Sequence, residues 1–279
     1  MLEMRSVEFD YEIPEIMYRK FPERSRQMLQ KILRLIEPSA GETIVDVGTG
    51  AGFLAFGLAE KVGKEGKVIG FDVSKSAIEQ ARLRLARKSH YPMLEFRVSD
   101  VYAIPLEHDF ADVVCCKSLI AGLEYRQKAI REMTRVAKPD GRVVAVEPGD
   151  LIGFPGQIKR AFYKTASATP LNERNLRNLF QRAGLRSIEI DTREPPITSN
   201  VATFEWTAKN LFGEHGLWNL AVEGGVDKDK VHLFHRELVR KIKTVGLRFG
   251  TRAIFCKGVK PQQASQPFLS RVDLREGAT

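Results

Sequence analysis

The chain has 279 residues, of which 43% are hydrophobic and 28% are charged, a balance that is typical of a globular protein and excludes wholesale disorder. No apolar run approaches the roughly 18 residues that a membrane-spanning helix needs, and the N-terminus lacks the basic and apolar pattern of a secretion signal. We therefore expect a cytoplasmic protein without a membrane span. The three cysteines lack zinc-ligand spacing and are expected to be reduced core residues: Cys115, Cys116 and Cys256.

The net charge of +9 is concentrated in the second half of the chain. Residues 150–279 carry 21 Lys and Arg against 13 Asp and Glu, an excess of +8. Such an excess attracts anionic small molecules, nucleic acid or lipid head groups, and it serves equally well as an undirected solubility feature. Composition alone does not choose between these partners.

The first half alternates short apolar runs with amphipathic stretches. A first helix is predicted between Pro22 and Glu37, where the apolar residues share one helical face and Pro38 marks the end. Buried strands are predicted at 43–48, 67–72, 94–99, 111–116 and 142–146, and further helices at 53–62, 76–88 and 127–136. Alternating strands and helices indicate an α/β fold, a parallel sheet with helices on both faces.

Beyond residue 147 the pattern changes. A helix is predicted at 172–183, a strand at 186–191 and a last strand at 253–257, and about fifty residues before that last strand contain two amphipathic stretches, 204–212 and 228–245. The predicted organisation has N-terminal lid helices over 1–37, a core over 38–196 and 251–260, a helical insertion over 197–250 and a tail over 261–279.

A glycine-rich turn carries the strongest functional signal. The run from Val45 to Gly52 is a buried strand that ends in Gly-x-Gly-x-Gly, and a helix follows at once. Glycines let a backbone approach a ligand closely, and the helix N-terminus presents unpaired N–H groups to an anionic end. A dinucleotide fingerprint would need its third glycine at position 53, which is Phe53. This spacing disfavours a NAD-dependent dehydrogenase.

Acidic residues end the second and third predicted strands. Asp72 lies 26 positions after Asp46, where a carboxylate can accept hydrogen bonds from both hydroxyls of a ribose. Asp100 ends the third strand, where a carboxylate can accept from an adenine amino group, and Val73 and Val101 can then sandwich the base. Each aspartate taken alone fits a cap or a turn. Three strand ends in register favour a nucleoside site instead.

With the runs 110–114 and 135–141, these motifs make the chain resemble class I S-adenosylmethionine-dependent methyltransferases, within the small-molecule group that includes ubiquinone/menaquinone-type and arsenite-type enzymes. The resemblance covers roughly residues 25–190 and the last strand. It implies a Rossmann-like sheet of seven strands, one of them antiparallel, with S-adenosylmethionine as cofactor and S-adenosylhomocysteine as product. The cofactor-binding residues that we expect are Asp46, Gly48, Thr49, Gly50, Gly52, Asp72, Val73, Asp100, Val101 and Lys117.

The catalytic group is less well defined by the sequence. Many relatives carry a histidine just after the fourth strand, but residues 117–122 contain none. Methyl transfer by direct displacement depends on alignment and water exclusion, so a dedicated base is optional. Glu147 is a candidate for orienting the acceptor or taking its proton, with a structural role at a strand end as the alternative. Lys117 is the second catalytic candidate.

The acceptor is predicted to be a small, partly apolar and anionic molecule. Tyr11 and Tyr18 of the N-terminal segment and Trp206 of the insertion are candidate acceptor contacts, together with Glu147. A methyltransferase that acts on RNA or protein through a basic C-terminal lobe is the alternative, so nucleic acid is not excluded as a partner. No metal is expected, because His232 and His235 share a helical face without a third ligand. The sequence does not indicate the oligomeric state.

Overall fold

The computed structural model describes residues 22–88, 91, 93–165, 170–195, 197–198, 200–210 and 216–262. The first half contains α2 (Pro22–Ile36), β1 (Thr43–Val47), α3 (Phe53–Val62), β2 (Lys67–Asp72), α4 (Lys75–Ala86), β3 (Leu94–Val98), β4 (Ala111–Lys117), the 3-10 turn η1 (Ile120–Gly122), α5 (Arg126–Val136) and β5 (Ala137–Ile152). The second half contains α6 (Gly156–Thr165), α7 (Glu173–Arg182), β6 (Arg186–Arg193), β7 (Ile197–Thr198), α8 (Val201–Asn210), α9 (Gly216–Glu223), α10 (Lys228–Val245), β8 (Leu247–Arg248) and β9 (Gly250–Val259).

Seven strands form one sheet in the order β3-β2-β1-β4-β5-β9-β6. The first five are parallel, and β9 runs antiparallel to both β5 and β6. The central strands β1 and β4 are almost fully buried, as expected of strands that helices cover on both faces. The predicted seven-stranded, mostly parallel Rossmann-like sheet with one antiparallel strand is confirmed.

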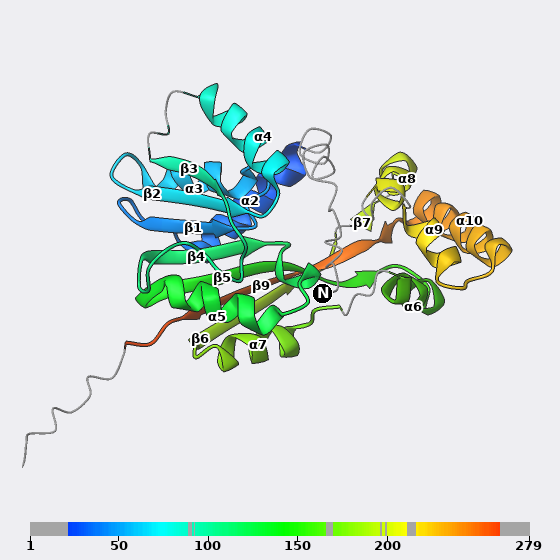
Figure 1. Cartoon of the computed structure of the whole chain (residues 1–279). Helices are drawn as coiled ribbons and strands as arrows, with labels where there is room; N and C mark the ends of the chain where they lie inside the picture. Colours follow the sequence, from blue (N-terminus) through cyan, green and yellow to red (C-terminus); the bar gives the residue numbers. More distant parts are fainter. Residues whose placement is uncertain are drawn as a thin grey trace, which may run out of the picture.

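Helices form a layer on each face of this sheet (Figure 1). One layer consists of α2, α3 and α4, whose buried side chains join those of β1, β2 and β3 in one apolar cluster. The opposite layer consists of α5 and α7, which pack on β4, β5 and β6. Ile32 and Ile36 of α2 are fully buried in the first cluster, so α2 belongs to the core and is not a lid helix as predicted. The rest of the predicted lid, residues 1–21, lies outside the described part.

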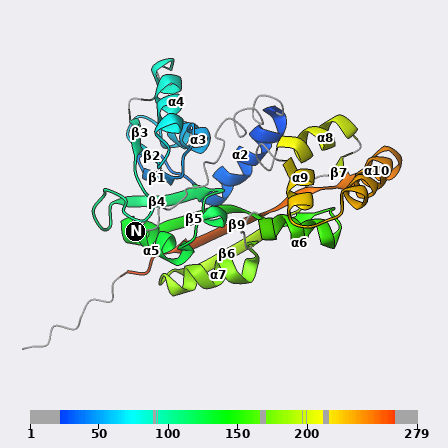
Figure 2. The same cartoon turned by 45° about the vertical axis from the view of Figure 1, so that its right-hand side comes forward.

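The insertion leaves the sheet at the carboxyl end of β5 (Figures 1 and 2). Its helices α6, α8, α9 and α10 share a third apolar cluster, in which Phe204 and Leu217 are fully buried. Leu151 and Ile158 belong to the same cluster. Residues 151–161 thus contribute to the apolar cluster of the insertion, while Leu151 and Ile152 also pair with β9 in the sheet, and the predicted boundary at 197 stays a prediction. The sequence also gave no indication of α6 or α9, whereas α10 has the predicted bounds.

None of the helices in the described ranges is both long enough and apolar enough to cross a membrane. All three cysteines are buried and unbridged, as expected.

Candidate functional site

The glycine-rich turn between β1 and α3 has a backbone that only glycine adopts easily. Gly48, Gly50 and Gly52 have φ of +72°, +54° and +87°. A Cβ at Gly52 would lie 2.7 Å from Cζ of Phe96, so packing also requires glycine there. Among the described residues, no atom lies within 4 Å of a Cβ at Gly50, which leaves room for a ligand on that side of the turn. The Gly48 N–H donates to the carbonyl of Phe71 at 2.7 Å and ties the turn to β2.

A buried carboxylate lies beneath this turn. Asp46, at 1% exposure, accepts a hydrogen bond from Oγ1 of Thr49 at 2.8 Å. Burial raises the pKa of Asp46 to about 7, opposed by the Thr49 hydrogen bond and by the Lys117 ammonium. A cation placed beside Asp46 would offset the cost of burying its charged form. The positively charged methionine portion of S-adenosylmethionine fits this requirement.

Asp72 connects the turn to the end of β2. Its Oδ2 accepts from the Gly50 N–H at 2.8 Å and its Oδ1 accepts from the Ser74 N–H at 3.0 Å. Each carboxylate oxygen can accept a second hydrogen bond, so both hydroxyls of a ribose can still be bound. The neighbouring Val73 is 66% exposed, which is unusual for an apolar side chain beside a buried sheet edge.

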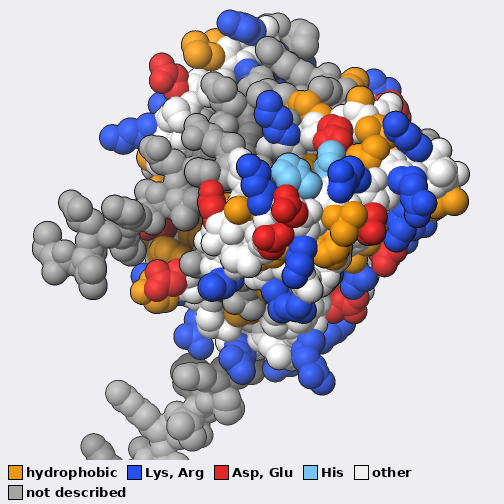
Figure 3. All heavy atoms as spheres, turned by 90° about the vertical axis from the view of Figure 1, so that its right-hand side faces the viewer, with side chains coloured by type: hydrophobic (Ala, Val, Ile, Leu, Met, Phe, Trp, Pro, Cys, Tyr) orange, Lys and Arg blue, Asp and Glu red, His pale blue; other side chains and the backbone are white. Residues whose placement is uncertain are grey.

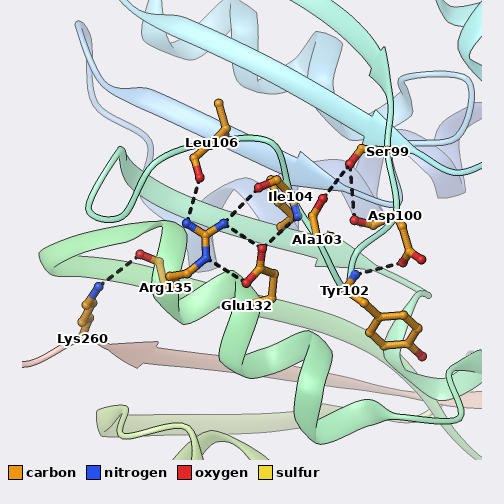
Figure 4. Close-up of polar contacts among 9 residues, drawn as sticks. All are labelled: Ser99, Asp100, Tyr102, Ala103, Ile104, Leu106, Glu132, Arg135 and Lys260. Atoms are coloured by element: carbon orange, nitrogen blue, oxygen red, sulfur yellow. Dashed lines mark hydrogen bonds and ion pairs between the residues drawn. The ribbon is translucent and has the colours of Figure 1, made fainter.

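Asp100 follows β3 at the same edge (Figure 4), and Val101 comes directly after it in the chain. Val98 pairs with Asp72, and the Ser99 N–H donates to the Asp72 carbonyl at 2.9 Å, so the two strand ends lie side by side. Asp100 is exposed, and its Oδ1 accepts from the Tyr102 N–H at 2.9 Å. The structure thus brings the predicted ribose and adenine residues to one edge of the sheet, beside the glycine-rich turn.

Glu147 proves to be engaged by the backbone. Its side chain is 1% exposed, and its two carboxylate oxygens accept from the N–H groups of Leu119 and Ala121, both at 3.0 Å. Burial raises the pKa of Glu147, and the hydrogen bonds from this segment oppose that rise. These contacts support the alternative that the sequence offered, a structural role at the end of β5. The predicted catalytic and acceptor-orienting roles stay predictions, because each carboxylate oxygen can still accept a second hydrogen bond.

The remaining candidates lie at different depths. Lys117, at the end of β4, is half-buried with its Nζ 3.4 Å from Oγ of Ser118, and its predicted role stays a prediction. Trp206 is half-buried on α8 of the insertion, and its predicted contact with the acceptor stays a prediction. Tyr11 and Tyr18 lie outside the described residues. Among the side chains described, no cluster could hold a metal ion, and His235 instead contacts Glu205 at 2.8 Å.

One feature of the site was missed from the sequence. Arg126 donates to the carbonyls of Ala121 and Leu123 at 2.8 and 3.3 Å, so it holds the same segment that Glu147 binds through N–H groups. Both residues act on backbone atoms, which sequence patterns do not identify. The segment 119–123 is therefore fixed from two sides at the switch between β1 and β4, where open α/β sheets bind ligands.

Comparison with known proteins agrees with this geometry. Residues 38–184 match the methyltransferase domain family. An arsenite methyltransferase of Halobacterium salinarum is 28% identical over 63% of this chain and 44% of its own length. A demethylmenaquinone methyltransferase of Desulfitobacterium hafniense is 28% identical over 56% of this chain and 70% of its own length. The chain thus spans less than half of the first relative and about two thirds of the second.

A solved structure shows the same fold. Phosphoethanolamine N-methyltransferase 2 of Haemonchus contortus, in complex with S-adenosyl-L-methionine, superposes with a TM-score of 0.59. The sequences are 18% identical, and the alignment covers 85% of this chain and 53% of that chain. At this identity the likeness concerns the fold alone. With the family match over residues 38–184 and the acidic and glycine-rich edge described above, the chain belongs to the methyltransferase domain family of class I S-adenosylmethionine-dependent methyltransferases.

Proposed function

We propose that this chain transfers the methyl group of S-adenosylmethionine to a small molecule by direct displacement. The observation that carries the proposal is the assembly of the glycine-rich turn, Asp72 and Asp100 at one sheet edge, with space beside Gly50 that no described residue fills. In this arrangement Asp72 binds the ribose, Asp100 the adenine amino group, and Val73 and Val101 the faces of the base. When bound, the cofactor supplies a methyl group on a positively charged sulfur.

The chain's own residues then need to align the acceptor and exclude water. The segment 119–123 follows β4 at the switch point, and Glu147 and Arg126 fix its backbone. We assign to this segment the wall of the acceptor site nearest the methyl group. Lys117 precedes it and supplies a positive charge for an anionic acceptor.

The insertion is proposed to cover the acceptor. Its helices leave the sheet at the carboxyl end of β5, the edge at which the cofactor residues lie. The face at this end carries many Lys and Arg side chains interspersed with Asp and Glu (Figure 3). Helix α10 alone has six Lys and Arg against two acidic residues. An apolar cluster with a basic surface suits a partly apolar, anionic small molecule.

Arsenite is disfavoured as the acceptor. The arsenite methyltransferase relative shares the fold region, but arsenic(III) chemistry depends on accessible thiolates. All three cysteines here are buried, and burial raises the pKa of Cys115 and Cys116 well above the ordinary thiol value. A partly apolar organic acceptor, of the general kind named for the demethylmenaquinone relatives, agrees better with these residues.

Cofactor binding is tested by calorimetry. We expect the wild type to bind S-adenosylmethionine and S-adenosylhomocysteine, and Asp72→Ala to weaken both by about 1–3 kcal/mol through lost hydrogen bonds to a desolvated ligand. Asp191→Ala is the matched control, because Asp191 is an exposed carboxylate on β6 that pairs with Arg193. Absence of heat with either ligand, together with clear binding of NAD, would overturn the proposal.

The acceptor class is tested by methylation assays with a panel of small phenols, carboxylic acids and amines. RNA and DNA binding is measured in parallel by fluorescence anisotropy from low to physiological salt. Nucleic-acid binding through phosphate contacts falls steeply, by about 0.9 log units per contact per log unit of salt for a duplex. Methylated RNA, with tight binding that persists at physiological salt, would replace the small-molecule proposal by an RNA methyltransferase.

A further inference from the structure

An ion pair on α5 lies directly beneath the loop that carries Asp100 (Figure 4). Arg135 contacts Glu132 through Nη2 at 2.7 Å and through Nε at 2.8 Å. Besides contacting each other, both side chains form hydrogen bonds with backbone atoms of residues 104–106. The pair therefore joins a helix of the second layer to the loop after β3.

Glu132 and Arg135 bind complementary backbone groups of the loop. Oε1 of Glu132 accepts from the Ile104 N–H at 2.8 Å. Arg135 donates from Nη2 to the Ile104 carbonyl at 2.9 Å and from Nη1 to the Leu106 carbonyl at 2.8 Å. The Glu132 carboxylate thus accepts from the N–H of Ile104, and the Arg135 guanidinium donates to the carbonyl of the same residue. Such charge-assisted hydrogen bonds fix both position and orientation of a backbone.

The pair is strongly coupled. Hydrogen bonds from Arg135 and from the Ile104 N–H hold the pKa of Glu132 below its ordinary value, and the hydrogen bond to Glu132 raises the pKa of Arg135. Both groups therefore stay charged throughout the physiological pH range. The contact is a permanent feature of the folded chain and not a pH switch.

Asp100 depends on this loop for its position. It is exposed, and the hydrogen bonds described around it are local: the Tyr102 N–H donates to its carboxylate, and the Ala103 N–H and Oγ of Ser99 donate to its carbonyl. Further along the loop, the Tyr102 hydroxyl accepts from the Tyr125 N–H at 3.2 Å, and the backbone of Ile104 is held on both sides by Glu132 and Arg135. Val101, buried in the core cluster, lies between Asp100 and these contacts. Displacement of residue 104 would therefore move the carboxylate of Asp100 and the side chain of Val101 together.

We propose that Glu132 and Arg135 are positioning residues that hold the loop 100–106 so that the Asp100 carboxylate meets the exocyclic amino group of the adenine. The inference rests on the proposed function, because it assigns the loop to adenine binding. It gives a role to two charged residues in the second helical layer that the catalytic proposal does not use.

A second ion pair offers a matched comparison. Arg142 contacts Glu42 at 2.7 Å, and the two side chains are 22% and 17% exposed, whereas those of Arg135 and Glu132 are 22% and 16% exposed. Glu42 precedes β1 and Arg142 begins the central part of β5, so this pair lies at the amino edge of the sheet. The two pairs are alike in contact distance and exposure and differ in which edge of the sheet they hold.

The test compares two ligands by calorimetry: S-adenosylhomocysteine and its deaminated analogue, in which the 6-amino group of the purine is replaced by a 6-oxo group. We expect the wild type to prefer the amino ligand by about tenfold or more, because the 6-oxo group offers Asp100 no donor. Asp100→Ala should abolish this preference. Arg135→Met should reduce it to about twofold or less, while Arg142→Met should retain it.

Folding is monitored by thermal unfolding of every variant. If Arg135→Met does not fold, Arg135→Lys and Glu132→Gln replace it, since both preserve part of the contact, and each should lower the preference by a smaller factor. The inference is overturned if the Arg135 and Glu132 variants weaken both ligands equally and keep the wild-type preference, or if the wild type binds S-adenosylhomocysteine without any preference. Failure of the wild type to bind either ligand would instead contradict the proposed function.

Discussion

The cofactor edge and the insertion are built in different ways. At the cofactor edge, glycines with positive φ and short acidic side chains fix backbone atoms: Asp72 binds the Gly50 N–H, and Gly48 binds the Phe71 carbonyl. The insertion is held by side chains, with Phe204 packed against Phe249 at a ring-centroid distance of 4.8 Å and against Trp218 at 6.1 Å. A glycine or aspartate mutation is therefore expected to disturb the cofactor edge, and truncation of an aromatic side chain is expected to disturb the insertion.

This difference agrees with a division of labour. The cofactor edge depends on main-chain groups and on a few short acidic side chains that the sheet fixes in place. A side-chain-built cluster of helices can change its shape and its surface without altering the sheet. We therefore expect cofactor affinity to depend on the edge and acceptor selectivity to depend on the insertion, and each prediction below separates the two.

The largest effect is expected from Phe204→Ala. Phe204 is fully buried in the third apolar cluster, and truncation of a buried phenylalanine costs about 3–5 kcal/mol. Hydrogen exchange measured by mass spectrometry should show faster exchange in α8, α9 and α10, with β1, β2 and β4 unchanged. S-adenosylhomocysteine affinity should stay within about twofold of wild type. Equally faster hydrogen exchange in the sheet strands and in the insertion helices would show that the two regions do not unfold independently.

A smaller but more local effect is expected from Gly52→Ala. The new Cβ would lie 2.7 Å from Phe96, on a backbone with φ of +87°, and strain and overpacking together should cost about 2–4 kcal/mol of the free energy of unfolding. Gly50→Ala is the matched control, since its Cβ would meet no atom within 4 Å and only the φ of +54° is unfavourable. Thermal unfolding should show a clearly larger loss for Gly52→Ala.

Titration of Gly50→Ala and Gly52→Ala with S-adenosylhomocysteine tests where the cofactor lies. Gly50→Ala should lower S-adenosylhomocysteine affinity by more than its stability loss suggests, because its Cβ points into the open side of the turn. Affinity unchanged in Gly50→Ala would show that the ligand does not approach this side. That result would contradict the assigned cofactor position while leaving the fold intact.

The same contrast explains what the sequence could predict. Buried parallel strands appear in the sequence as apolar runs, so the parallel part of the sheet was predictable. Glycines at positive φ appear as a spaced motif, so the turn between β1 and α3 was predictable as well. Strand β5 extends to Ile152, well past the predicted 146, because its far end pairs with β9 and lies outside the apolar run. Antiparallel pairing beyond the core leaves little trace in local composition.

Residues that act on backbone atoms were the least predictable. The sequence left Glu147 open between a catalytic and a structural role, and its contacts with the Leu119 and Ala121 N–H groups are visible only in the folded chain. Arg126, Glu132 and Arg135 read from the sequence as the solvated face of an amphipathic helix. Helix α6 was missed because its apolar face packs on α9, far along the chain, and not on the sheet.

The smallest effect is expected at Asp46, and it depends on pH. Burial raises the pKa of Asp46 from 3.8 to about 7, so between these values the folded chain binds more protons than the unfolded chain. The free energy of unfolding should therefore fall as pH rises from about 4 to about 7, and the cost is fully present above pH 7. Asp46→Asn removes this titration. It should stabilise the cofactor-free protein at both pH 5 and pH 8, and by about 2 kcal/mol more at pH 8 than at pH 5.

Thermal unfolding of the wild type and Asp46→Asn at pH 5 and pH 8 measures this dependence, with Asp112→Asn as the control. Partial burial acts to raise the pKa of Asp112, but hydrogen bonds from Lys138 and the Thr43 N–H outweigh it and lower that pKa. The stabilisation from Asp112 is thus already present above its unfolded pKa, and Asp112→Asn should destabilise the chain at both pH values. Asp46→Asn should also weaken S-adenosylmethionine binding at pH 8, because the buried charge that costs stability is the charge that attracts the cationic cofactor. Equal unfolding temperatures of Asp46→Asn and wild type at pH 8, with unchanged affinity, would show that Asp46 carries neither the cost nor the attraction.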